Sequence, residues 1–368
     1  MHYIITGKTY NGKFIEQHHD DIQVLSTEAL ASSDIRFGIK DKLYVPSETA
    51  LSTVLDKLDD LDAKRGILML KDKYKCREAL SDMYPDFYFR KCGILDLFEM
   101  DPPHKKIAIK PQRGFFGTGV RFADIDSDMT AIAEQVTNDI KSNGRFFPES
   151  VLSTQDILLE EYVEGEEYAV DMFYDSNGNA EIMNIYHHPE PAIKEYAHLM
   201  YYSNKELFDR YLEEFTILFK ELGKHMNLVN FPIHAEFKRS HERFIPIEFN
   251  PMRYGGFGLA DLGFLSYEKQ AISCYFQNSH VDWQQIWNSR QERNYAFVLA
   301  YNGKDVDIST QKPLHKSFRQ HLNRYASVMD YVQLDHQSNP VFAIAYVQTD
   351  DYQQLMELLN TDFNDFFI

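Results

Sequence analysis

Two carboxylates and an amide near the middle of the chain have the spacing of a magnesium site. Within 231–250, apolar and polar residues alternate along two stretches, which predicts a β-hairpin with its turn near 241–242. Antiparallel pairing about that turn places Glu236 opposite Glu248, with Asn250 two residues further along the same face. Three oxygen ligands would then share one side of the hairpin.

Opposed carboxylates destabilise a sheet unless a positive charge neutralises them. Mg²⁺ prefers oxygen ligands and commonly takes one or two carboxylates together with nucleotide phosphates. The sequence therefore predicts Glu236, Glu248 and Asn250 as metal ligands. The alternative is a solvated polar face, on which Glu and Asn are common.

Cations and glycines suited to phosphate binding precede the hairpin. Lys110 lies near the end of a predicted strand over 106–111. Lys73 lies between a predicted buried strand, the apolar run 67–70, and a helix predicted to start near Tyr74. Successive glycines let backbone N–H groups close over phosphate oxygens. The three glycines after Lys110 are Gly114, Gly117 and Gly119. An ordinary glycine-rich hairpin and a solvated lysine are the alternatives.

An acidic connector broken by a glycine follows at 158–168. The end of an apolar strand can hold an adenine through backbone contacts, and a carboxylate just beyond it can accept both ribose hydroxyls. The alternative is an acidic surface loop.

In this order, the motifs resemble those of the ATP-grasp superfamily, over about 65–260. The resemblance implies an ATP-grasp fold and binding of ATP with Mg²⁺, or with Mn²⁺ in its place. It assigns Lys73 and Lys110 to the phosphates and the three glycines to a flap. It assigns Glu160, Glu161 and Val163 to the adenine, Glu167 to the ribose, and Glu236, Glu248 and Asn250 to the metal.

One position departs from the family pattern. Many members carry Asn-Pro-Arg, whose arginine binds the activated carboxylate, whereas here Arg253 stands one place later, after Asn250-Pro251-Met252. We still assign that role to Arg253, with a plain surface arginine as the alternative. His187 and His188 are candidates for the acceptor pocket, with a turn carrying two exposed histidines as the alternative reading.

The resemblance implies a carboxylate–amine ligase that forms ADP through an acyl phosphate, with amino-acid or dipeptide ligation as the favoured chemistry. Arg253 and Lys110 would be its catalytic residues. The alternatives are a phosphotransferase acting on a non-carboxylate acceptor and a non-catalytic ATP-binding regulator. The expected partners are a small carboxylate and an amine, and a homodimer is left open.

Charge and composition are consistent with that class. The 368 residues carry a net charge of -18, which opposes binding to nucleic acid and to anionic lipid. Three cysteines without metal-ligand spacing, and no apolar run of membrane-spanning length, favour a cytoplasmic protein. The first residues become polar too soon for a signal peptide.

The elements that must position these residues predict an α/β (α+β) fold in four parts. Alternating strands and helices in 1–95 predict a parallel α/β domain. The lid of the ATP-grasp fold is expected over 96–163 and its palm over 164–290. A small α/β unit, 291–368, completes the chain.

Overall fold

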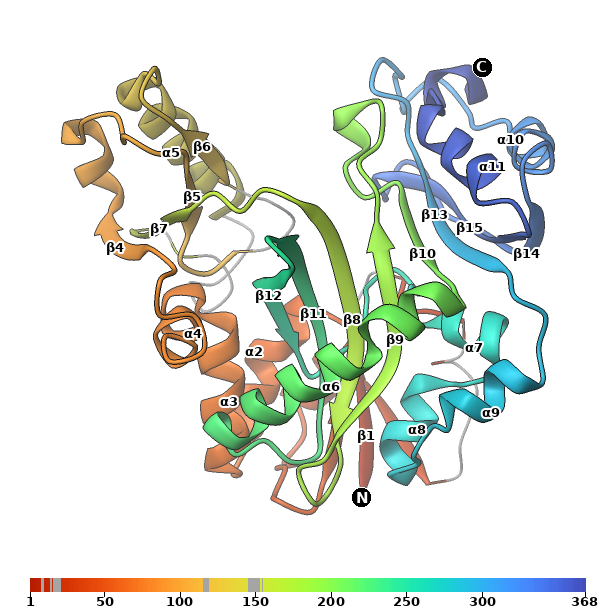
Figure 1. The fold of residues 1–368 in the computed structure, drawn as a ribbon, viewed down its shortest axis with the longest axis horizontal. Coiled ribbons are helices and arrows are strands. Elements are labelled where there is room, and N and C mark those ends of the chain that lie inside the picture. Colours follow the sequence, from red (N-terminus) through yellow and green to blue (C-terminus); the bar gives the residue numbers. More distant parts are fainter. Residues whose placement is uncertain (8–9, 14, 16–20, 115–118, 145–152, 154) are drawn as a thin grey trace.

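The strands of the protein form three sheets, and the predicted hairpin lies at one edge of the largest (Figure 1). This computed structural model describes residues 1–7, 10–13, 15, 21–114, 119–144, 153 and 155–368. Across those ranges, no helix is both long enough and apolar enough to cross a bilayer. The predicted α/β class is confirmed, while the boundaries between the four predicted domains stay predictions.

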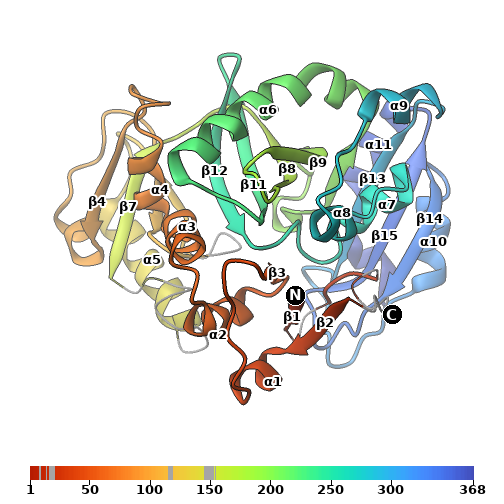
Figure 2. The same ribbon diagram turned by 90° about the horizontal axis from the view of Figure 1, so that it is seen from below.

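The first sheet has three parallel strands in the order β2-β1-β3, as the alternation of strands and helices predicted. Its elements are β1 (His2–Thr6), β2 (Ile22–Ser26), α1 (Thr27–Ala31), β3 (Lys42–Tyr44) and α2 (Glu48–Lys57). Just after β3, the Val45 N–H donates to the carbonyl of Met252 at 2.7 Å. This bond ties the N-terminal sheet to the end of the hairpin. Figure 2 shows β1, β2 and β3 of this sheet together with α1 and α2.

The strand predicted at 67–70 is wrong, because these residues lie within helix α3 (Leu61–Lys71). A short apolar run fits a strand and a buried helix equally well. Ile67 and Leu70 are buried, three residues apart on one helical face, whereas Leu68 is 43% exposed. The next helix, α4 (Lys73–Ala79), begins at Lys73, one residue before the predicted start near Tyr74.

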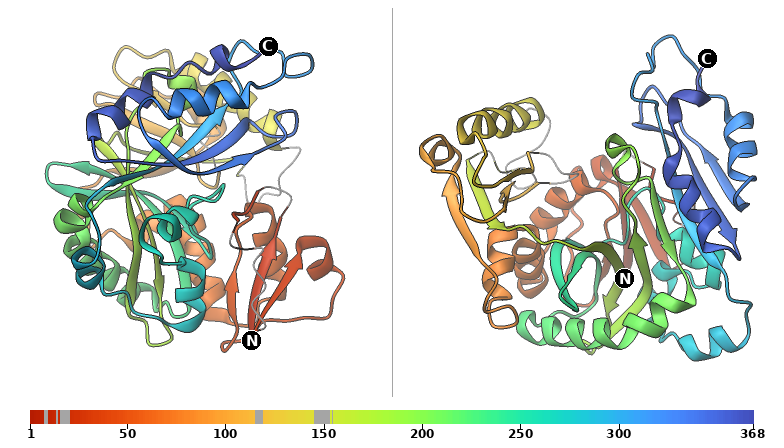
Figure 3. Two further views of the ribbon diagram at one scale, coloured as in Figure 1. Left: turned by 90° about the vertical axis from the view of Figure 1, so that its right-hand side faces the viewer. Right: turned by 45° about the horizontal axis from the view of Figure 1, so that its top comes forward.

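The second sheet is antiparallel, with the order β4-β7-β5-β6. Its strands are β4 (Phe89–Gly93), β5 (Ile107–Pro111), β6 (Arg121–Ala123) and β7 (Asp156–Glu161). Helix α5 (Met129–Gly144) and the 3-10 turn η1 (Ile94–Glu99) cover it and share its small, separate core. This unit stands on one side of the hairpin (Figure 3).

The third sheet has eight antiparallel strands in the order β12-β11-β8-β9-β10-β13-β15-β14. Its first five strands along the chain are β8 (Glu166–Tyr174), β9 (Ala180–His188), β10 (Met200–Ser203), β11 (Phe231–Ser240) and β12 (Arg243–Pro251). The long helix α6 (Lys205–Met226) runs across β8 and β9 (Figure 1), and it confirms the amphipathic helix that the sequence predicts over about 205–226. Its apolar stripe is buried, including Phe215 and Phe219.

The C-terminal strands extend this same sheet beyond β10. They are β13 (Asn294–Tyr301), β14 (Ser327–Gln333) and β15 (Val341–Thr349). The remaining helices and turns are η2 (Lys194–Tyr196), α7 (Asp261–Tyr267), α8 (Ala271–Gln277), α9 (Trp283–Asn288), α10 (His315–Leu322), α11 (Tyr352–Glu357), η3 (Leu358–Asn360) and η4 (Phe363–Phe366). The sequence predicts strands over 295–300 and 342–347 and a helix over 350–359, which correspond to β13, β15 and α11, but it does not predict β14 or α10. Residues after 290 therefore share a continuous sheet with the hairpin.

Candidate active site

The hairpin has the register predicted from the sequence. Glu236 pairs with Glu248, and His234 pairs with Asn250. The turn residues His241 and Glu242 have φ values of 48° and 65°, in the left-handed region typical of a tight hairpin turn. The predicted metal ligands Glu236, Glu248 and Asn250 therefore lie on one face of β11 and β12.

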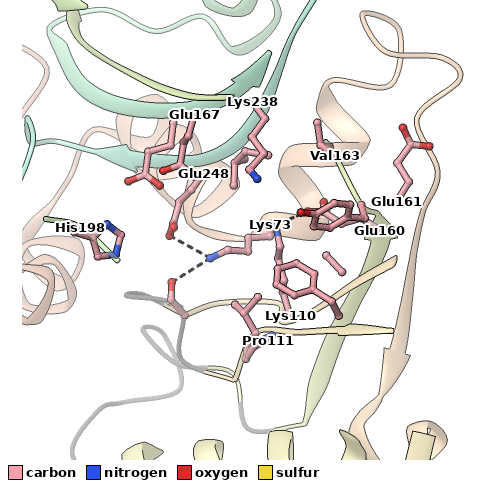
Figure 4. A pocket seen from close by; sticks show the side chains of 17 residues that line it. Lys73, Lys110, Pro111, Glu160, Glu161, Val163, Glu167, His198, Lys238 and Glu248 are labelled. Carbon is pink, nitrogen blue, oxygen red and sulfur yellow. Dashed lines mark hydrogen bonds and ion pairs between the residues drawn. The ribbon is translucent and has the colours of Figure 1, made fainter. Parts of the chain in front are cut away.

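Two cavities meet at this face. The smaller cavity, of about 250 Å³, lies between the hairpin and the four-stranded sheet (Figure 4). Nine of the predicted site residues line it, namely Lys73, Lys110, Gly114, Glu160, Glu161, Val163, Glu167, Glu236 and Glu248. Residues from five separate segments of the chain thus line one cavity, and the sequence predicts that these residues bind a nucleotide.

The larger cavity, of about 600 Å³, lies on the other side of the metal-ligand candidates. Arg253, Asn250, Glu236 and Glu248 line it. Glu236 and Glu248 border both cavities, and so does His198. The two carboxylates therefore stand at the boundary between two spaces, each large enough for part of a substrate.

The glycine segment is only partly described. Gly114 lines the smaller cavity, whereas Gly117 lies outside the described residues. Gly119 has a φ of +69°, and a Cβ atom at this position would lie 3.0 Å from Pro111. Gly119 therefore serves the turn itself, and it is not among the residues found to line either cavity.

Lys73 bridges the hairpin and the glycine segment. Its ammonium group lies 3.1 Å from Glu248 Oε1 and donates to the carbonyl of Gly114 at 3.1 Å (Figure 4). Asp72 fixes this position, because its carboxylate caps α4 and accepts two hydrogen bonds of 2.6 Å from Gln112. A phosphate in the smaller cavity would thus contact Lys73, whose ammonium group is held by both Glu248 and Gly114.

Lys110 forms a buried ion pair with Glu160. The Lys110 ammonium lies 2.5 Å from Glu160 Oε1, and Arg77 Nε donates to Oε2 at 2.7 Å. Burial opposes ionisation of Glu160, but the charges of Arg77 and Lys110 outweigh it and lower the pKa to about 2. Beyond its predicted place beside an adenine, Glu160 therefore joins β5, β7 and α4.

His187 and His188, the candidates for the acceptor pocket, lie in surroundings that differ from the predicted ones. His187 and His188 form the end of β9 and are largely shielded from solvent, so the reading as a turn with two exposed histidines is wrong. Neither is among the residues found to line either cavity. His188 Nδ1 lies 2.7 Å from the carboxylate of Glu167. His188 therefore orients the predicted ribose-binding carboxylate.

The sequence analysis did not predict a series of buried charged side chains that leads to the metal-ligand candidate Glu236. Asp171 Oδ1 accepts hydrogen bonds from His234 Nδ1 at 2.8 Å and from the backbone N–H of Gly255 at 2.9 Å. His234 Nε2 lies 3.5 Å from Glu236 Oε1. One signal was available, because Asp171 interrupts an otherwise apolar strand and buried charges are normally paired. Asp171 thus positions Glu236 through His234.

We expect Asp171→Asn to lower kcat/KM for Mg-ATP by roughly 10- to 100-fold, the usual effect of losing a group that orients a metal ligand. The amide no longer offers His234 a charged acceptor, so the imidazole loses its fixed orientation toward Glu236. Steady-state ADP release measures the effect. Asp175→Asn, in the turn just after the same strand, is the control and should stay within two-fold. Equal kinetics of the two variants would contradict this role for Asp171.

Arg253 is held by the N-terminal part of the chain. Its Nε and Nη2 atoms donate to Glu48 Oε1 at 3.1 and 3.0 Å, and Lys71 donates to the other carboxylate oxygen at 2.7 Å. The reading as a plain surface arginine is wrong, because the side chain is only 13% exposed. Burial opposes ionisation of Glu48, but Lys71 and Arg253 lower its pKa to about 2.

The depressed pKa values of Glu48 and Glu160 predict loss of stability in acid. Both carboxyls have folded-state pKa values near 2, below the ordinary value of 4.5. Their contribution is complete above about pH 4.5 and is lost as the pH falls toward 2. Urea denaturation across this range should show the decline. Glu160→Gln removes one of the two groups and should give a shallower decline, so an equal slope would contradict the prediction.

The donor set of the hairpin fits a hard divalent cation. Two carboxylates and one amide offer only oxygen ligands, which Mg²⁺ prefers. Within the described ranges, no group of three or more His, Cys, Asp or Glu side chains is arranged to hold a metal. A metal at this face would therefore need Asn250 and further ligands from a substrate. The described cysteines, Cys76, Cys92 and Cys274, are free thiols.

Comparison with known proteins bears on the fold that carries the site. Residues 104–261 match the family model of the ATP-grasp domain. No curated protein sequence matches the chain. Three solved structures illustrate the similarity of fold.

The L-amino acid ligase from Bacillus licheniformis has a TM-score of 0.65 at 13% identity, covering 100% of this chain and 98% of the ligase. N5-carboxyaminoimidazole ribonucleotide synthetase from Thermotoga maritima has a TM-score of 0.60 at 11% identity, covering 97% and 96%. Biotin carboxylase from Campylobacter jejuni, in a β-γ-ATP complex, has a TM-score of 0.59 at 11% identity, covering 96% and 82%. These low identities show a shared fold, and within the chain residues 104–261 match the ATP-grasp domain.

Proposed function

We propose that the chain is an Mg-ATP-dependent, ADP-forming ligase that joins a small-molecule carboxylate to an amine through an acyl phosphate. One observation carries this proposal: the two cavities meet at Glu236 and Glu248. A nucleotide in the smaller cavity would direct its phosphates toward these acids. A carboxylate in the larger cavity would then approach the γ-phosphate from the other side.

In this proposal the smaller cavity binds ATP. Lys73 and Lys110 contact the phosphates, beside Gly114. Glu160, Glu161 and Val163 lie beside the adenine, while Glu167, oriented by His188, accepts the ribose hydroxyls. The biotin carboxylase of similar fold was solved with β-γ-ATP, which supports this assignment.

Glu236, Glu248 and Asn250 would hold the Mg²⁺, or Mn²⁺ in its place. When bound, the metal supplies positive charge beside the transferring phosphoryl group. Lys73 pairs with Glu248. If the metal replaced Lys73 as the partner of that carboxylate, the ammonium group of Lys73 would be free to contact a phosphate. Asp171 and His234 keep Glu236 in place throughout.

In the reaction we propose, a carboxylate oxygen attacks the γ-phosphorus and ADP leaves. The amine then attacks the acyl carbon, loses a proton and displaces phosphate. Arg253 binds the carboxylate, and Glu48 fixes the guanidinium. The chain contributes mainly positioning and electrostatic stabilisation, as expected of phosphoryl transfer. Amino-acid or dipeptide ligation is the finer form of the proposal, supported by the fold shared with the L-amino acid ligase.

The test is a screen of carboxylates with Mg-ATP, in which hydroxylamine serves as the amine and both ADP and hydroxamate are measured. A ligase yields both products in equal amounts. ADP without hydroxamate from any carboxylate would favour a phosphotransferase, and ATP binding without ADP would favour a regulator. A homodimer and a cytoplasmic location remain expectations from the sequence.

A further inference from the structure

The larger cavity has walls that the proposed chemistry does not yet use. Its volume of about 600 Å³ is within the range of small-molecule sites and exceeds the needs of a reacting carboxylate alone. The hairpin supplies one wall and the N-terminal sheet region, with Glu48, supplies another. A third comes from β13, through Phe297 and Leu299. The C-terminal strands thus take part in shaping this site.

The β13 wall is apolar, and residues of neighbouring segments extend it. Phe297 and Leu299 are two residues apart, so they project from the same face of the strand. Tyr201, the cross-strand partner of Phe297 on β10, also lines the cavity. Leu259, from the segment after the hairpin, adds to this apolar surface. Such a wall favours an apolar group of a ligand over a hydrated one.

The charges of the cavity oppose a phosphorylated ligand. Four carboxylates, Glu28, Glu48, Glu236 and Glu248, line it among the described residues. The opposite charges beside them are Arg253 and His234, and His234 is already paired with Asp171 and Glu236. Even when a metal neutralises the two hairpin acids, Arg253 remains shared with Glu48. A phosphate group would bring roughly two negative charges and needs several N–H donors. A zwitterion brings one charge of each sign and fits this lining.

We infer that the larger cavity binds an unphosphorylated amino acid with a large apolar side chain, and that Phe297 and Leu299 select that side chain. This inference rests on the proposed function and names its substrate class. The amino acid's carboxylate lies toward Arg253 and the hairpin, where it would meet ATP. Its side chain lies against the β13 wall.

The charge and polarity of the ligand are tested with single amino acids. Hydroxamate formation is measured with Mg-ATP, hydroxylamine and one of L-leucine, L-phenylalanine, L-serine or O-phospho-L-serine. We expect kcat/KM to be at least about 10-fold higher for leucine or phenylalanine than for serine. O-phospho-L-serine should not exceed the background. A preference for serine or for its phosphate would overturn the inference.

Selection by the β13 wall is tested with a matched pair of variants. Leu299→Ala shortens a side chain that lines the cavity and should raise the KM for L-leucine about 10-fold. Val298→Ala removes apolar volume from the same strand but on its other face, away from the cavity, and should leave KM within two-fold. Leu299→Phe fills space and should shift the preference toward L-alanine. Melting temperatures report the effect of each change on folding.

The outcomes separate this inference from the proposed function. Equal KM values for Leu299→Ala and Val298→Ala would overturn selection by the wall. Titration with Mg-ATP, followed by calorimetry, tests the nucleotide site independently. Mg-ATP binding without hydroxamate from any of the four amino acids would overturn the substrate class alone. Absence of Mg-ATP binding would overturn the proposed function itself.

Discussion

Glu248→Gln is expected to reduce ADP release by roughly 10²- to 10⁴-fold, the equivalent of several kcal/mol of charge stabilisation. The amide keeps the size and shape of the side chain but removes its charge. A metal at the hairpin would lose one of its two carboxylates, and Lys73 would lose the partner 3.1 Å away. Both losses fall on the boundary between the two cavities.

The measurement is steady-state ADP release across a range of Mg²⁺ concentrations. The variant should need more Mg²⁺ for half-maximal rate as well as having a lower kcat. Glu242→Gln is the matched control, because Glu242 is an exposed carboxylate in the turn of the same hairpin. It should stay within two-fold of the unmodified protein. Product formation by Glu248→Gln at the unmodified rate would refute the assignment of the metal site.

Glu160→Ala is expected to lower the free energy of unfolding by about 3–5 kcal/mol, the usual cost of removing one partner of a buried ion pair. Glu160 is 2% exposed and accepts from both Lys110 and Arg77. Arg77 Nη2 finds no hydrogen-bond partner in the described part of the chain. Without Glu160, two buried cations would face each other with no carboxylate between them.

Chemical denaturation measures this loss, and Glu161→Ala is the control. Glu161 is the next residue of β7, projects from the opposite face and is only partly buried, so its removal should cost less than about 1 kcal/mol. Glu160→Gln retains an acceptor and should give an intermediate loss. If Glu160→Ala were no less stable than Glu161→Ala, the ion pairs would not stabilise the fold.

The sequence by itself determined the local elements that show a clear period. Alternation of apolar and polar residues gave the hairpin and its register, including the pairing of Glu236 with Glu248. The apolar stripe over 205–226 gave the bounds of α6. Both predictions agree with the structure because the period of a strand or a helix can be recognised from residues that are close together in the sequence. The order of motifs also predicted candidate binding residues, nine of which line the smaller cavity.

Short apolar runs carry too little of that information. The stretch 67–70 fits either period, and only packing against the rest of the protein made it helical. Strand β14 was missed for a related reason, because it is an edge strand with few fully buried residues and a weak alternation. Such segments take their structure from the neighbours they meet.

The tertiary structure alone decided which distant charges meet. Arg253 pairs with Glu48, 205 residues earlier in the chain, and His234 pairs with Asp171, 63 residues away. It also decided that Leu299, from the C-terminal strands, shares a cavity with the hairpin. No periodic pattern reports such contacts, because a buried charge or an apolar wall depends on chain segments brought together only by folding. The sequence thus predicts the metal-ligand candidates, and the fold decides which residues hold and enclose them.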